Sequence, residues 1–278
     1  MDKNFKLEIE YVNCLLCKND SYEILTNYSI YDTTLNIVRC KCGFIYLNPR
    51  PSIDSISFFY NDEYIPHKSN NISFPLNWFK KLTFTWKENI INKLFYNPAT
   101  MLDVGSGDGS FSKYMSESGW KAKSYDKFAP GFNNKGHKNR KFDLITMWHS
   151  LEHFHDSDAV IKEVHNLLKN NSYLLIALPN YNSIDRKIFQ DKWIAFDVPR
   201  HLYHYTSDTI KKYLDYHNIR IVSSKVMYQD TFFNIYLSLK NNILYKTLFF
   251  PFITIFALFL IFFNKDKASS ILYICQKK

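Results

Sequence analysis

The chain lacks an apolar run near its start and lacks a compact cluster of basic residues. Residues Met1 to Tyr11 alternate charged and apolar side chains without the hydrophobic core of a secretory signal, so we expect a cytoplasmic protein. Acidic residues are too few to balance the basic ones, 26 against 35, which gives a formal net charge of +9. This surplus favours anionic partners such as nucleic acid, phospholipid or phosphate-linked molecules. With 46% hydrophobic residues in 278, the chain can build a full core and is not disordered.

Cysteine is also scarce, but four of the five cysteines fall in two short clusters: Cys14 with Cys17, and Cys40 with Cys42. In a cytoplasmic protein, such clusters indicate a metal site before a disulfide. Four thiolates from two turns can close a tetrahedral structural zinc site. The second cluster is one residue shorter than the first, which strains the chelate loop, so a metal-free ribbon is the alternative. We expect a zinc-ribbon-like module over residues 1–50, ending where Asn48 to Ser52 breaks regular structure.

Three glycines at alternate positions follow an apolar strand. Residues Met101 to Gly109 read Met-Leu-Asp-Val-Gly-Ser-Gly-Asp-Gly, and Ser110 to Glu117 then has the composition of a helix. Glycines let the backbone turn sharply and approach a ligand closely, so a nucleotide-like ligand is expected over the start of that helix. Dinucleotide-binding units space their glycines G-x-G-x-x-G, whereas this chain reads G-x-G-x-G. A nicotinamide oxidoreductase is therefore the least favoured reading.

An acidic residue ends the next short segment that we expect to be extended. Asp126 closes the stretch from Trp120, which we expect to be the second strand. A carboxylate at that position can accept hydrogen bonds from both hydroxyls of a ribose. The alternative is a solvated aspartate in a turn.

Three further segments make the pattern specific: residues 142–154, Phe-Asp-Leu-Ile-Thr-Met-Trp-His-Ser-Leu-Glu-His-Phe; 174–180, Leu-Leu-Ile-Ala-Leu-Pro-Asn; and 193–206, Trp-Ile-Ala-Phe-Asp-Val-Pro-Arg-His-Leu-Tyr-His-Tyr-Thr. With the glycine motif they resemble class I S-adenosylmethionine (SAM)-dependent methyltransferases, and the third resembles a signature of one bacterial branch. The resemblance covers roughly residues 100–230, with an echo of the closing strand at 269–275. It implies a Rossmann-like α/β sheet and a SAM site made by Asp103, Gly105, Ser106, Gly107, Asp108, Gly109, Asp126 and Trp148. Related proteins also carry two cysteine pairs near the N-terminus, which supports structural zinc as a second cofactor.

The predicted sheet departs from that family in one place. Only 15 residues, 127–141, connect the second strand to the fourth, and a crossover alone needs about a dozen. We therefore expect the third strand to be missing or vestigial. The predicted organisation is the module at 1–50, a mostly helical connector at 51–97 with an amphipathic helix over 77–95, and a methyltransferase domain at 98–278.

A cluster of histidines is expected at the methyl-acceptor side. His149, Glu152 and His153 have i, i+3, i+4 spacing, which predicts one face of a helical turn after the fourth strand, and His201 is expected to cap the same pocket. His153 or His201 suits general-base catalysis on a hydroxyl acceptor, with structural histidines as the alternative. Ubiquinone-pathway O-methyltransferases are similar here, with Glu-x-x-Glu-His and a divalent metal. His149 replaces the first carboxylate, which weakens a magnesium site and favours base chemistry without metal.

An uncharged, phenylalanine-rich segment at 247–263 lies in a hydrophobic insertion at 244–263 and is flanked by Lys240, Lys246, Lys265 and Lys267. It is marginal for a membrane span, and the closing strand after it must return to the catalytic sheet. We expect one-sided contact with the inner face of the cytoplasmic membrane, peripheral or monotopic; a homodimer interface or a true span are the alternatives.

These features predict a SAM-dependent methyltransferase that O-methylates a glycan, lipid-linked or other envelope-related small molecule. An RNA methyltransferase is the first alternative, but the lysines are scattered and nucleic acid is not favoured. The second is a catalytically silent membrane adaptor, against which the intact glycines and Asp126 argue.

Overall fold

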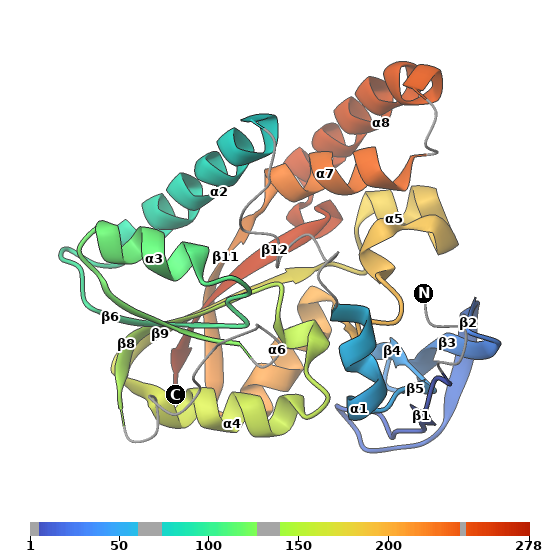
Figure 1. The fold of residues 1–278 in the computed structure, drawn as a ribbon, viewed down its shortest axis with the longest axis horizontal. Helices are drawn as coiled ribbons and strands as arrows, with labels where there is room; N and C mark the ends of the chain where they lie inside the picture. The colour runs from blue at the N-terminus through green and yellow to red at the C-terminus, as the bar shows by residue number, and fades with distance from the viewer. Residues whose placement is uncertain (1–5, 61–73, 127–139, 240–242) are drawn as a thin grey trace.

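The computed structural model describes residues 6–60, 74–126, 140–239 and 243–278. Its centre is a six-stranded sheet in the order β11-β12-β9-β8-β6-β7 (Figure 1). Strands β6, β7, β8 and β9 pair in parallel, and β12 runs antiparallel to both of its neighbours, so the sheet is mixed. The strands are β6 Thr100–Val104, β7 Lys121–Tyr125, β8 Phe142–Trp148, β9 Leu168–Pro179, β11 Ile219–Val226 and β12 Ser270–Lys277.

Helices cover both faces of this sheet, because successive side chains of a strand point to opposite sides. Met101 packs in one apolar cluster with Ile91 and Phe111, whereas the adjacent Leu102 packs in another with Ile161. In Figure 1, α2, α3 and α7 lie above the sheet and α4 and α6 below it. These helices are α2 Phe74–Asn92, α3 Ser110–Glu117, α4 Ser157–Leu167, α6 Ser207–Tyr216 and α7 Tyr228–Ser238.

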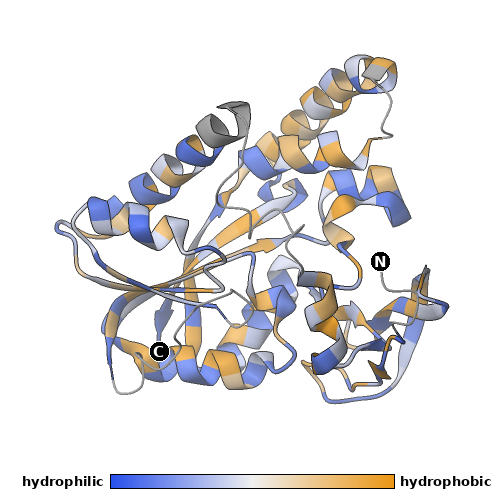
Figure 2. Cartoon of the chain, viewed as in Figure 1, coloured by the Kyte–Doolittle hydropathy of each residue, from blue (hydrophilic) through white to orange (hydrophobic). Residues whose placement is uncertain are grey.

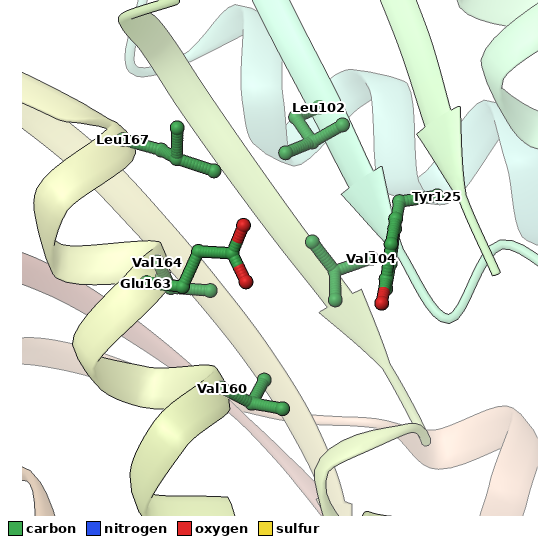
Figure 3. A pocket seen from close by; sticks show the side chains of 7 residues that line it. All are labelled: Leu102, Val104, Tyr125, Val160, Glu163, Val164 and Leu167. Atoms are coloured by element: carbon green, nitrogen blue, oxygen red, sulfur yellow. The ribbon is translucent and has the colours of Figure 1, made fainter. Parts of the chain in front are cut away.

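In the described part of the chain, the sheet ends at β7. Residues 127–139, on which the expectation of a missing third strand rests, lie outside the described residues. On the α4 side of this edge, Leu102, Val104 and Tyr125 form a shallow apolar pocket with side chains of α4 (Figure 3). Glu163 places its carboxylate at this pocket.

The N-terminal cysteine region forms its own small sheets, and one of them includes a strand from much later in the chain. Strand β10, Tyr203–His204, pairs with β4, Ile45–Leu47, in the order β10-β4-β3-β2. Leu47 N also donates to Leu202 O at 2.9 Å. The N-terminal region and the segment that forms the central sheet thus share one hydrophobic core. The other strands are β1 Ile9–Glu10, β2 Tyr22–Ile30, β3 Thr33–Cys40 and β5 Arg50–Pro51.

Two helices near the C-terminus carry an unusually apolar surface. Helix α8, Ile243–Phe263, packs against α7 and α5, Ile184–Phe189. Leu244–Phe263 is long and apolar enough to cross a membrane by length and composition, and only 17% of its most apolar stretch is buried. The remaining helices are α1 Ile53–Ile56 and the 3-10 turns η1 Ser57–Tyr60, η4 Leu151–His153, η5 Gln190–Lys192, η6 Ile194–Phe196 and η7 Lys265–Lys267.

Candidate active site

The glycine turn lies between the end of β6 and the start of α3. Gly105, Gly107 and Gly109 have φ values of +73°, +55° and +70°, the left-handed region that favours glycine. A Cβ on Gly105 would lie 2.2 Å from the Ser150 Cβ, so a larger residue does not fit there. Gly107 N donates to Asp126 Oδ2 at 2.8 Å. The structure therefore brings Asp126 to the glycine turn, where one of its oxygens holds the turn backbone.

The other predicted cofactor residues surround this turn. Asp103 is buried and accepts a 2.6 Å hydrogen bond from the Thr146 hydroxyl, and burial raises its pKa to about 6. Asp108 accepts from Ser110 N at 2.9 Å at the start of α3. Ser106 Oγ and Trp148 Nε1 are buried, and neither has a hydrogen-bond partner among the described residues. Buried polar groups are normally paired, so these two atoms point to a ligand that supplies the partners.

Two lysines of α2 reach the same region, and the sequence reading missed them. Lys80 Nζ lies 3.1 Å from Asp108 Oδ2 and 3.0 Å from Ser110 Oγ. Lys87 Nζ lies 4.4 Å from the ring centroid of Trp148 and 4.9 Å from that of Phe111. Burial lowers the Lys87 pKa to about 8, against the opposing effects of Asp103 and Asp230. In the sequence, the i, i+7 spacing of the two lysines on a predicted amphipathic helix was the feature that could have indicated that both lie on the same face.

His149 sits in a charged environment that the sequence did not reveal. Its backbone has a φ of +52°, so it precedes the short 3-10 turn η4 instead of sharing one helical face with Glu152 and His153, as we expected. Nε2 lies 2.8 Å from Asp230 Oδ2 of α7, and Nδ1 lies 3.6 Å from Glu152 Oε1. Burial opposes the charge, but the two carboxylates raise the His149 pKa to about 10. His149 is therefore an imidazolium at neutral pH and cannot act as a base.

His153 and His201 do lie together, as predicted, with ring centroids 4.6 Å apart. His201 Nδ1 lies 2.8 Å from Ala195 O; because a carbonyl only accepts, this nitrogen carries a proton, and Nε2 lies 3.7 Å from Asp197 Oδ2. Burial and the nearby His201 lower the pKa of His153 to about 4, so it is neutral near pH 7. His153 Nδ1 contacts Arg200 O at 3.1 Å and the hydroxyl of Tyr60 at 2.8 Å. No sequence signal marked Tyr60.

Glu152 lies at the centre of this cluster. Its side chain is fully buried, and neither carboxylate oxygen has a hydrogen-bond partner among the described residues. Burial opposes ionisation, but His149 and the neighbouring histidines lower its pKa. Ligand atoms of Glu152, His153 and His201 lie within 4.8 Å of one another, close enough to hold a metal ion. The arrangement can therefore serve either as a base cluster or as a three-ligand metal site.

The four clustered cysteines also converge. Their sulfur atoms lie within 4.8 Å of one another, with Cys14 Sγ 3.5 Å from Cys42 Sγ and Cys17 Sγ 3.3 Å from Cys40 Sγ. Tetrahedral zinc thiolates at about 2.3 Å from the metal place sulfurs about 3.8 Å apart, so the short second cluster still permits the zinc geometry. All four cysteines are free thiols in the structure.

Residues 78–224, more than half of the chain, match the family described as a methyltransferase domain. The chain belongs to this methyltransferase family. The match covers the glycine turn, Asp126 and the histidine cluster, and it makes the protein an enzyme of this class. No curated protein matches the sequence.

Solved structures agree with the fold. The 1,6-didemethyltoxoflavin-N1-methyltransferase of Burkholderia thailandensis, bound to 1,6-didemethyltoxoflavin and S-adenosylhomocysteine, is 13% identical with a TM-score of 0.50, and the match covers 90% of this chain and 98% of that one. A SAM dependent methyltransferase of Archaeoglobus fulgidus is 20% identical with a TM-score of 0.44, covering 71% and 94%. Magnesium protoporphyrin IX methyltransferase of Synechocystis PCC 6803 with bound SAH is 12% identical with a TM-score of 0.47, covering 82% and 100%. The family match and the Burkholderia structure show that the chain has the Rossmann-like methyltransferase fold.

Proposed function

We propose that this methyltransferase transfers the methyl group of SAM to a hydroxyl group of a lipid-linked, glycan or other envelope-related small molecule at the inner face of the cytoplasmic membrane. The observation that carries the methyl transfer is the direct junction of the two half-sites. Ser150, between His149 and Glu152, donates to Val104 O at 2.8 Å and packs against Gly105. A ligand on the glycine turn and an acceptor at the histidine cluster would therefore meet at the ends of β6 and β8.

The residues present fit SAM. Asp126 follows β7 and can accept hydrogen bonds from the ribose hydroxyls, and the glycines let the backbone approach the nucleoside closely. Ser106 Oγ and Trp148 Nε1 are available as polar partners. We orient the carboxylate of the cofactor's methionine part toward Lys87, whose Nζ lies over the Trp148 ring. Bound SAM supplies the electrophilic methyl group.

The chain's own contribution at the acceptor is proton removal and orientation. Methyl transfer is an in-line displacement, so the acceptor oxygen must be held about 3 Å behind the methyl group and must lose its proton. His153, which is neutral near pH 7, and His201 are the candidates for that base. The His149 imidazolium is fixed through both ring nitrogens by Asp230 and Glu152, and its positive charge can stabilise the negative charge that develops on the acceptor oxygen.

A structural zinc ion at Cys14, Cys17, Cys40 and Cys42 belongs to the same proposal. The site would lie in the N-terminal module of residues 1–50, before the connector at 51–97 and the methyltransferase domain at 98–278. Because β4 follows Cys42 closely and pairs with β10, the metal would brace the segment that carries His201. In the alternative of an RNA methyltransferase, the cysteine ribbon would instead help to bind phosphates. That alternative rests on the positive charge alone.

Two experiments test the function. Calorimetry should show binding of SAH to the wild type and loss of binding in Gly107→Val, because a side chain blocks backbone approach; Glu117→Val, at an exposed position in the last turn of α3, is the control. Unchanged affinity in Gly107→Val would overturn the cofactor site. Methylated lipids, glycans and RNA should then be compared between cells with and without the gene to identify the acceptor. A difference confined to RNA would support the RNA alternative.

A further inference from the structure

Helices α7 and α8 are rich in apolar residues (Figure 2), and many of these side chains are exposed; we call these exposed side chains the hairpin face. The largest exposures are on α8, where Leu244 is 75% exposed and Phe262 82%. Exposed patches of this kind on soluble proteins mark interaction sites. The hairpin face consists of Tyr228, Phe232, Phe233, Tyr236 and Leu237 of α7, and Leu244, Leu248, Phe252, Ile255, Phe256, Phe259, Phe262 and Phe263 of α8.

The hairpin face belongs to a fixed part of the fold. Thr254, Ala257 and Ile261 recur on the opposite side of α8 and are buried. Ala257 shares a small core with Ile235 and Leu239 of the α7 region. Helix α8 is therefore held against the protein over its C-terminal half, and its outer side remains without a partner in the described residues.

The charges beside the hairpin face favour an anionic lipid surface. Lys246 lies in the first turn of α8, with Nζ 4.0 Å from the ring centroid of Tyr236, and Lys265 and Lys267 follow its end. Helix α8 contains no acidic residue. A symmetric dimer through this face would bring two sets of like charges together, whereas phospholipid headgroups would neutralise them. Tyrosines at the margin and phenylalanines within it also match an interfacial helix. Lys240 lies outside the described residues.

Helix α7 connects this surface directly to the acceptor side of the active site. Asp230, in its first turn, holds His149 at 2.8 Å, and Phe233 is exposed on the hairpin face three residues later. A helix with its side chains is only about 10 Å wide, so an acceptor whose head contacts His149 can leave an apolar tail beside α7.

We infer that α7 as well as α8 lies in the headgroup and acyl boundary of an anionic bilayer, and that the acceptor is an amphiphile methylated on its polar head while its tail stays in the lipid. This inference rests on the proposed function and adds two points to it: a membrane contact made by α7, and an acceptor class that excludes free water-soluble glycans.

The test compares full-length variants for binding to vesicles of phosphatidylcholine with 30% phosphatidylglycerol, about the anionic content of the surfaces that attract lysines. Sedimentation should show wild-type binding and at least a tenfold weaker partition of the α7 variant Phe232→Ser/Phe233→Ser. The control Tyr96→Ser, a fully exposed aromatic far from the hairpin, should bind as the wild type does. SAH affinity should stay unchanged in all three, which separates folding and cofactor binding from lipid contact.

Each other outcome has a definite meaning. If Phe252→Ser/Phe259→Ser in α8 abolishes vesicle binding but the α7 variant binds normally, the inference is overturned while the proposed membrane function stands. If the wild type is a dimer by light scattering, does not bind vesicles, and becomes monomeric in the α7 variant, a second copy covers the face and the inference is overturned. If the wild type itself does not bind SAH, the proposed function is overturned instead.

The acceptor class has its own readout. The wild-type protein is incubated with methyl-labelled SAM and a total membrane extract, followed by partition between organic solvent and water. Label in the organic phase, reduced at least tenfold in the α7 variant, is the expected result. Label found only in the aqueous phase would overturn the amphiphile.

Discussion

The hydroxyl of Tyr60 lies 2.8 Å from Nδ1 of His153, a candidate base 93 residues away in the sequence. Arg200 O lies 3.1 Å from the same nitrogen. Since a carbonyl only accepts, Nδ1 carries the proton and Nε2 is the nitrogen left to take the acceptor's proton. The Tyr60 hydroxyl then accepts from the same N–H, so the connector between the cysteine region and the sheet adds a second contact that orients a residue at the active site.

Replacing Tyr60 should therefore slow the chemical step. We expect Tyr60→Phe to lower kcat about tenfold, because general-base contributions are of order 100-fold or more and this change only weakens the base. The KM for SAM should not change. Methyl incorporation into membrane extract measures both constants, and Tyr11→Phe, an exposed phenol, is the control. An equal change in kcat and cofactor affinity would indicate a general structural role.

The His149–Asp230 pair should be detectable as a raised pKa of His149. Asp230→Asn removes the nearest carboxylate, so the His149 pKa should fall from about 10 by about two units, as measured by NMR. Asp20→Asn, a distant exposed acid, should leave it unchanged. Because the folded-state pKa is raised, the pair stabilises the fold below the unfolded pKa of about 6.5, and this contribution is lost as pH rises through about 10. The wild type should lose more stability than Asp230→Asn between pH 8 and 11.

Lys87 should recognise the amino-acid end of the cofactor. Lys87→Met is expected to weaken SAH binding about tenfold or more, because a charge-assisted hydrogen bond contributes roughly 1.5–3 kcal/mol. Binding of 5′-methylthioadenosine, which has no carboxylate, should be unaffected. Lys81→Met, on the exposed side of α2, serves as the matched control. Equal losses for both ligands would mean that Lys87 acts only by holding α2 in place.

The cysteine cluster should hold about one equivalent of zinc by elemental analysis. Cys17→Ser should lose the metal and lower the free energy of unfolding by about 3 kcal/mol or more, since metal binding is coupled to folding. Cys275→Ala, in β12, should keep the metal. A zinc content far below one equivalent with unchanged stability in Cys17→Ser would establish the metal-free ribbon.

The sequence was most informative where the signal is local. The glycine turn, the helix at Ser110–Glu117 and the closing strand near Ser270 were predicted from short runs whose composition dictates their backbone. The helix over 77–95 was also predicted and appears as Phe74–Asn92, but its periodicity did not show that Lys80 and Lys87 face the cofactor side.

What the sequence could not predict depends on contacts between distant segments. His149 was expected on a helical face, yet it adopts a left-handed backbone with Asp230 of α7 as its partner. Neither Asp230 nor Tyr60 lies in a recognisable motif. The strand Tyr203–His204 is two residues long, and only its pairing with β4 makes it a strand. Such pairing is specified by tertiary context and not by local preference.

The pairing of β4 with β10 also constrains how the chain folds. The cysteine region is synthesised first, but its sheet is completed only after more than half of the chain has followed, since β10 lies at Tyr203–His204. Until then β4 has an unpaired edge, the kind of edge that promotes association between nascent chains. Early metal binding would keep that edge in its native register while the sheet is synthesised. The cysteine region and the catalytic sheet should consequently unfold as one cooperative unit, and a truncation that removes residues before Ile53 should expose β10 and lose solubility.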